Sequence, residues 1–240
     1  MARSSQPILN VPMVVAAISA LLVLVHVVRA LVDEWTDVEI LLWFAFVPAR
    51  YFSGLATKLP LPGGEAADVW TFVTYAFLHG DYVHLLVNLV WFLAFGTAVA
   101  RRFGAFRFLA FFAVTSAAGA VAHLLSHWGE LAPLVGASAA ISGMMAASMR
   151  FAFEVGGPLG LLRDGSDESY RVPAAPLSRA LRHPQVFVFL AVWILINIGF
   201  GLGAPPELVG NGTIAWEAHF GGLLAGLFLF PLFDPVEASE

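Results

Sequence analysis

The sequence predicts an all-α membrane protein, a six-transmembrane-helix bundle, from its composition and from the lengths of its apolar stretches. Of the 240 residues, 59% are hydrophobic and only 12% are charged, and the mean hydropathy is +0.81. A soluble domain is closer to half apolar and one quarter charged, so this composition is typical of a polytopic membrane protein. Six apolar stretches have about the length that crosses a bilayer as a helix. They cover approximately residues 11–32, 82–100, 106–125, 138–153, 184–200 and 214–233.

The distribution of basic residues predicts the orientation of these spans. Nine of the twelve Lys and Arg residues precede the first span or lie in, or at the span ends next to, the connections after the second and fourth spans. By the positive-inside rule, both termini and these two connections are cytoplasmic. The first span is too long for a signal peptide, so we expect it to be retained. The predicted organisation is a cytoplasmic tail (1–10), a membrane domain (11–233) with an outer loop (33–81) and a cytoplasmic loop (154–183), and a second cytoplasmic tail (234–240).

Composition and spacing also exclude several classes of function. The chain has no cysteine, which excludes disulfides, thiolate metal sites and a cysteine nucleophile. Its net charge of −5 gives no basic surface for nucleic acid. His79 and His84 are five residues apart, and no carboxylate accompanies them at the spacing of a metal-binding helix. We therefore expect no metal, no cofactor and no nucleic-acid partner.

The segment 136–147 consists of apolar and very small residues with two hydroxyls, Ser138 and Ser142, one helical turn apart. Gly136 lies just before Ser138, where a chain that turns into a helix needs a permissive backbone. Small residues let membrane helices approach closely, so a packing surface is the simpler interpretation of this segment alone. A nucleophilic role for Ser138 requires a base and an oxyanion site elsewhere in the chain.

The second span carries His84 and Asn88 on one face near its outer end. Two neutral hydrogen-bond donors one turn apart can hold an oxyanion, although they can equally bond neighbouring backbone carbonyls. Ionisable groups inside a membrane are costly and are therefore candidate sites. We expect the remaining histidines outside the last span to be structural or solvated: His26, His123, His127 and His183.

The last span places His219 beside a row of small residues that is typical of closely packed membrane helices. The fourth span has a matching row, and packing of the two rows would bring His219 to Ser138 across 81 residues of sequence. Glu217 points elsewhere on its helix, so a dyad is favoured over a Ser-His-Asp triad. The two rows are Ala218, Gly222 and Gly226 in the last span and Ala139, Gly143 and Ala147 in the fourth.

Three separated motifs thus occur in order along the chain: His84-x-x-x-Asn88, Gly136-Ala137-Ser138, and Ala218-His219-x-x-Gly222-x-x-x-Gly226. Together they resemble the motifs of the rhomboid intramembrane serine proteases, and the similarity extends over residues 70–231. The resemblance implies a rhomboid-like bundle of six transmembrane helices. It also implies a Ser138–His219 dyad and an oxyanion site formed by His84, Asn88 and the backbone N–H of Ser138.

The activity implied by this resemblance is that of an intramembrane serine endopeptidase, which cleaves transmembrane segments of membrane-protein substrates. The expected location is a bacterial inner (plasma) membrane, with cytoplasmic termini, as a monomer or weak oligomer. Span 184–200 and the loop 201–213 are expected to move to admit substrate, with Trp193 and Phe200 as candidate gate residues.

The chain departs from the family pattern at three positions. Ala139 follows the serine where the family usually has glycine, and Thr71 follows Trp70 where the family often has arginine. Ser142 stands one turn after Ser138, where an aromatic residue could stack on the imidazole.

Two alternatives from other classes of function remain open at this point. One is a catalytically inactive rhomboid-like protein that binds membrane clients, although inactive relatives are expected to lack the serine or the histidine. The other is a transporter or channel with a histidine proton relay, which predicts inverted-repeat halves that the sequence does not display.

Overall fold

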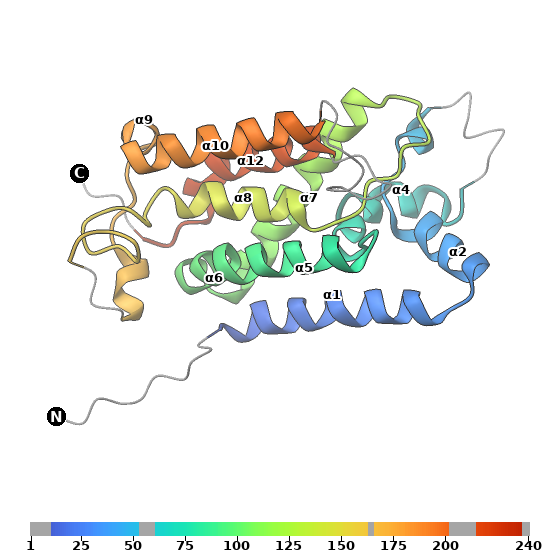
Figure 1. Cartoon of the computed structure of the whole chain (residues 1–240), viewed down its shortest axis with the longest axis horizontal. Helices are drawn as coiled ribbons and strands as arrows, with labels where there is room; N and C mark the ends of the chain where they lie inside the picture. The colour runs from blue at the N-terminus through green and yellow to red at the C-terminus, as the bar shows by residue number, and fades with distance from the viewer. Residues whose placement is uncertain (1–10, 53–60, 163–165, 202–214, 237–240) are drawn as a thin grey trace.

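The computed structural model describes residues 11–52, 61–162, 166–201 and 215–236, whose regular structure is helical (Figure 1). The predicted all-α class is confirmed for these residues. Four helices among them are long and apolar enough to cross a membrane. They are Met13–Leu31 (α1), Tyr82–Phe103 (α5, η3 and α6 in succession), Ala105–Ser126 (α7) and Trp216–Phe233 (α12). These helices match the first, second, third and sixth predicted spans.

The fourth and fifth predicted spans correspond to shorter apolar helices. Helix α8 covers only Ser138–Ser148, and 11 residues at about 1.5 Å each reach roughly half of a 30 Å hydrocarbon core. Helix α10 covers Pro184–Gly201, and within it Pro184–Gly199 is an apolar helical segment shorter than the four spans above. The predicted fourth span is too long because the chain leaves the helix at Ser148, where protein rather than lipid surrounds the backbone. The count of six spans therefore stays a prediction.

Helix α8 lies in the middle of the molecule, and α7 and α12 pack against it (Figure 1). Helix α5 (Tyr82–Trp91) continues through a π-helical turn, η3 (Phe92–Gly96), into α6 (Thr97–Phe103). The core on this side consists mainly of aromatic and aliphatic side chains from α1, η3, α7 and α8. A second, smaller cluster joins α8 to α10 and α12.

The predicted outer loop (33–81) has a folded structure of its own in its described part. It contains α2 (Glu34–Phe44), η1 (Pro48–Tyr51), α4 (Gly64–Thr74) and η2 (Tyr75–Phe77). The indole N–H of Trp70 donates to the carbonyl of Trp43 at 3.0 Å, and the two rings stack 6.1 Å apart. These contacts hold α4 against α2.

The connection between α8 and α10 contains η4 (Asp167–Arg171) and α9 (Leu177–Arg182). Buried Arg102, in α6, donates to the carbonyls of Tyr170 and Val172 and to both carboxylate oxygens of Asp234, each at 2.8 Å. One guanidinium thus joins this connection to the segment after α12. Residues 1–10, 202–213 and 237–240, which the sequence assigns to the tails and the last outer loop, lie outside the described residues.

Candidate active site

Ser138 and His219, separated by 81 residues in the sequence, lie in hydrogen-bond contact. The Oγ atom of Ser138, the first residue of α8, is 2.7 Å from Nε2 of His219, the fourth residue of α12. A hydroxyl at this distance from an imidazole nitrogen has the geometry of a nucleophile and its general base.

The close packing of α8 and α12 brings this pair together. A Cβ atom added at Gly222 would lie 2.0 Å from the carbonyl oxygen of Ala139, and one added at Gly226 would lie 2.2 Å from that of Gly143. Glycine at these positions is therefore required for the two backbones to touch. The predicted pairing of the two rows of small residues is confirmed, and below we call it the α8–α12 seam.

The loop before α8 is fixed by backbone hydrogen bonds to the segments between α2 and α5. Gly136 donates its N–H to the carbonyl of Tyr75 at 3.0 Å, and Leu134 exchanges two backbone hydrogen bonds with Phe46. Gly136 has φ +113°, a conformation that residues with side chains rarely adopt. This glycine therefore sets the direction in which the chain enters α8 and positions Ser138.

His84 faces this same glycine from the first turn of α5. A Cβ atom at position 136 would lie 2.7 Å from Nε2 of His84 and 3.8 Å from Oγ of Ser138, so both polar atoms border one small space. The N–H of Gly80 donates to Nδ1 of His84 at 3.4 Å. Because Nδ1 accepts this bond, the proton of a neutral His84 ring is on Nε2, which faces the space beside Ser138.

His79, just before α5, is fully buried, and its ring packs edge-on against that of His84 with centroids 5.0 Å apart. Burial, together with the nearby His84, His26 and Arg29, lowers the pKa of His79 to about 3. His79 is therefore neutral at physiological pH, and it supports His84 as an uncharged neighbour.

Asn88 and Ser142 are used within their own helices. The side-chain amide of Asn88 donates to the carbonyl of His84 at 2.9 Å, which is the structural alternative considered from the sequence. This bond occupies one of the two amide N–H groups. The hydroxyl of Ser142 donates to the carbonyl of Ser138 at 2.7 Å.

Sequence reasoning missed Asn197, in α10. Its Oδ1 atom lies 2.5 Å from Nδ1 of His219, on the side of the ring opposite Ser138. One signal was available in the sequence, because Asn197 is the only strongly polar side chain in the apolar stretch Val186–Phe200. A polar residue at membrane depth usually bonds a partner in another helix.

The carboxylate of Glu217 makes its hydrogen bond with α7 and not with His219. Its carboxylate lies 2.7 Å from Nδ1 of His123, whose Nε2 faces the carbonyl of Ala132 at 2.9 Å. His123, His127 and Glu217 offer ligand atoms within 4.8 Å of one another. Within this group, His123 and Glu217 are in direct hydrogen-bond contact, which joins the start of α12 to the end of α7. The expectation that Glu217 points away from His219 agrees with this arrangement.

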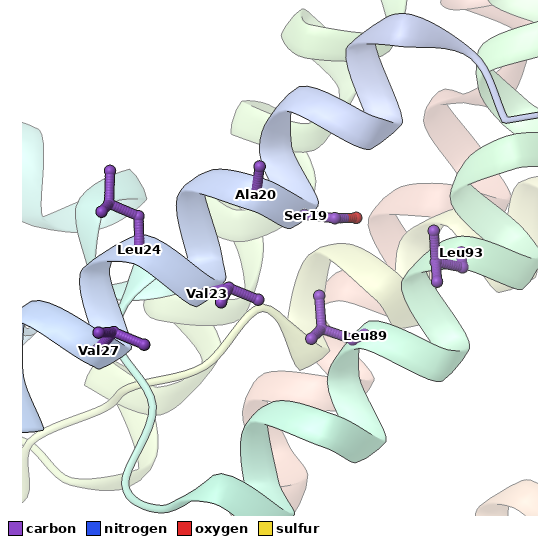
Figure 2. Close-up of a pocket in the computed structure, with 7 residues that line it drawn as sticks. All are labelled: Ser19, Ala20, Val23, Leu24, Val27, Leu89 and Leu93. Atoms are coloured by element: carbon purple, nitrogen blue, oxygen red, sulfur yellow. The ribbon is translucent and has the colours of Figure 1, made fainter.

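An apolar groove between α1 and α5–η3 lies apart from these residues (Figure 2). All its lining residues except Ser19 are apolar, as suits a surface that faces lipid. They are Ser19, Ala20, Val23, Leu24 and Val27 from α1, and Leu89 and Leu93 from the second span.

The fold and the site together define a helical membrane protein with a serine–histidine pair among its helices. Among known protein families, the model described as Rhomboid domain matches residues 66–158, a region that includes His84, Asn88 and Ser138 but not His219. The chain is 22% identical over 170 residues to RHOMBOID-like protein 5 of Arabidopsis thaliana, covering 69% of this chain and 44% of that protein.

Two bacterial relatives are named Rhomboid protease GlpG. The one from Yersinia pestis is 24% identical over 171 residues, which cover 71% of this chain and 50% of the relative. The one from Haemophilus influenzae is 34% identical over 53 residues, which cover 22% of this chain and 28% of the relative. The chain thus aligns with half or less of the length of each. The matched domain and these relatives support a member of the rhomboid family, and together with the apolar helices they support an integral membrane protein and, at the level of the family, an intramembrane protease.

Proposed function

We propose that this protein is an intramembrane serine endopeptidase that cleaves transmembrane segments of membrane-protein substrates through a Ser138–His219 dyad. The observation that carries the proposal is the distance of 2.7 Å between Ser138 Oγ and His219 Nε2. A serine hydroxyl is a weak nucleophile until a neighbouring base accepts its proton. The names of the bacterial relatives, which are those of proteases, support this proposal.

In the proposed reaction, His219 accepts the hydroxyl proton while Ser138 Oγ bonds to the carbonyl carbon of the scissile peptide. The tetrahedral intermediate collapses when the C–N bond breaks and His219 returns the proton to the leaving amine. A water molecule, activated by the same imidazole, then hydrolyses the acyl-serine and restores the hydroxyl. The substrate backbone must leave its helix at this point, so helix-weakening residues near the cleavage site favour the reaction.

The proposed oxyanion site is the space beside Gly136. The Nε2–H of His84 faces it, and the backbone N–H of Ser138 is free of an intrahelical partner because it belongs to the first turn of α8. The N-terminal end of a helix also favours negative charge. Asn88 stays in the proposal as a third donor through its second amide N–H group.

The proposed topology follows the positive-inside rule, with cytoplasmic termini in a bacterial inner membrane and the start of α8 near the outer surface. Substrate then reaches Ser138 after α10 and the following loop move. A monomer or weak oligomer suffices, because one chain contains every residue of the proposed mechanism.

The test is cleavage of a single-span substrate by the purified protein in detergent, with Ser138→Ala and His219→Ala as variants. Both substitutions should abolish cleavage, and Ser148→Ala, in the same helix, should not. Cleavage by the Ser138→Ala protein at the rate of the parent would contradict the proposal. The client-binding alternative would be favoured if the parent does not cleave substrate, and if the parent and the Ser138→Ala variant bind membrane proteins equally well.

A further inference from the structure

Both nitrogens of the His219 ring have side-chain partners, and they come from different helices. Nε2 lies 2.7 Å from Ser138 Oγ in α8, and Nδ1 lies 2.5 Å from Asn197 Oδ1 in α10. The dyad of the proposed mechanism uses only the first of these contacts. The second is short and specific, and it needs its own explanation.

The orientation of the Asn197 amide is set by a third group. Its Nδ2 donates to the carbonyl of Trp193, one turn earlier in α10, at 2.8 Å. A carbonyl oxygen can only accept, so the NH₂ side of the amide faces Trp193 and the oxygen faces His219. The oxygen also only accepts, and Nδ1 of His219 must therefore carry the proton. In the neutral ring this leaves the lone pair on Nε2, directed at the hydroxyl of Ser138.

The burial of Asn197 makes this contact unusual for its helix. Asn197 is 6% exposed, whereas Leu195, Ile196 and Ile198 are 68%, 50% and 38% exposed. Burying an amide is costly unless both of its ends are hydrogen-bonded, as they are here. The second half of α10 thus exposes the apolar side chains of Leu195, Ile196 and Ile198 and directs the polar side chain of Asn197 toward His219.

We propose that Asn197 is the positioning residue of the dyad, which fixes the tautomer and the ring orientation that let His219 act as the base for Ser138. This inference rests on the proposed protease function. As a neutral acceptor, Asn197 orients the imidazole without placing a second charge inside the membrane. Such a group favours the reaction because a ring with its proton on Nε2 cannot accept the serine proton, and a ring free to rotate is less often oriented to do so.

The test compares Asn197→Leu, Asn197→Asp and the control Leu195→Ala in the cleavage assay. Asn197→Leu keeps the size of the side chain and removes the acceptor, so kcat should fall by about 10- to 100-fold while KM stays within about twofold. Asn197→Asp restores an acceptor and should recover much of the loss. Its carboxylate also stabilises the imidazolium, so the acidic limb of the pH–rate profile should move to higher pH. The other ionisable groups that act on His219, His84 and Glu217, are the same in every variant.

A spectroscopic measurement makes the test independent of turnover. In protein with ¹⁵N-labelled histidine, the His219 ring should show the Nδ1–H form in the parent, and Asn197→Leu should lose it. Parent-like kcat and an unchanged His219 spectrum in Asn197→Leu would overturn the inference. So would a loss of activity that matches a loss of thermal stability and that Asn197→Asp does not reverse. If instead Ser138→Ala cleaves substrate, the proposed protease mechanism fails. The ¹⁵N spectrum of His219 then still shows whether Asn197 fixes the tautomer of the ring.

Discussion

Helices α8 and α10 both contact His219, but they are packed in opposite ways. Every residue of α8 from Ala139 to Ser148 is buried, and its backbone touches that of α12 along the α8–α12 seam. Helix α10 has buried core residues, Val186 and Leu190, in its first half, and in its second half Leu195, Ile196 and Ile198 are exposed. The side of the imidazole that faces Ser138 is therefore held by backbone packing, and the side that faces Asn197 by one hydrogen bond.

Because of this difference, we expect changes in the two helices to affect different properties of the protein. Substitutions in the seam should act first on stability, because backbone atoms have no room to move aside. Changes that affect α10 should act first on activity, since few buried contacts resist its displacement and a small shift removes a partner of His219.

The largest expected effect is that of Gly222→Val. A Cβ atom there lies 2.0 Å from the carbonyl oxygen of Ala139, so α8 and α12 must separate. We expect a cost of about 3 kcal/mol or more, with loss of folded protein or a strongly lowered Tm followed by tryptophan fluorescence. The control is Leu224→Val, at an exposed position of the same helix. A Gly222→Val protein with the Tm of the parent would show that the seam is not tightly packed.

His84→Ala tests the α8 side without touching the seam. It removes the Nε2–H that faces the space beside Gly136. We expect kcat to fall by about 10²- to 10³-fold with little change in Tm, as for loss of one oxyanion donor. His84→Gln, which keeps an N–H donor, should recover part of the activity. Equal activity of His84→Ala and the parent would remove His84 from the proposed oxyanion site.

A smaller effect is expected from restraining α10. The rings of Phe95, in η3, and Phe189, in α10, are 6.0 Å apart. Because the chain has no cysteine, Phe95→Cys and Phe189→Cys can be joined selectively by a short, reducible cross-linker. If α10 must move to admit substrate, the cross-link should lower cleavage by about tenfold, and reduction should restore it. Full cleavage by the cross-linked protein would show that this movement is not needed.

The features that the sequence could predict are those that follow from local pattern. Long apolar stretches mark four helices because a membrane requires a minimum length. The repeats of Ala218, Gly222 and Gly226 indicated the seam, and the seam brought His219 to Ser138, because small residues four apart permit backbone contact.

The features that could not be predicted depend on tertiary environment. The length of α8 is set by the protein that surrounds it, so a rule based on lipid thickness extended it to residue 153. The partner of Asn197 depends on how α10 is rotated, and its apolar sequence does not encode one face. The position of Asn88 one turn after His84 is compatible both with an oxyanion donor and with a bond to a backbone carbonyl. Only the structure showed that its amide donates to the carbonyl of His84.

The most direct measurement is covalent labelling of the intact protein with a serine-reactive fluorophosphonate, followed by mass spectrometry of the peptides. If Ser138 is activated by His219, the parent carries one adduct on Ser138, and His219→Ala loses it while keeping its fold. A parent protein that cleaves substrate but carries its adduct elsewhere, or a His219→Ala protein labelled at the rate of the parent, would contradict the dyad.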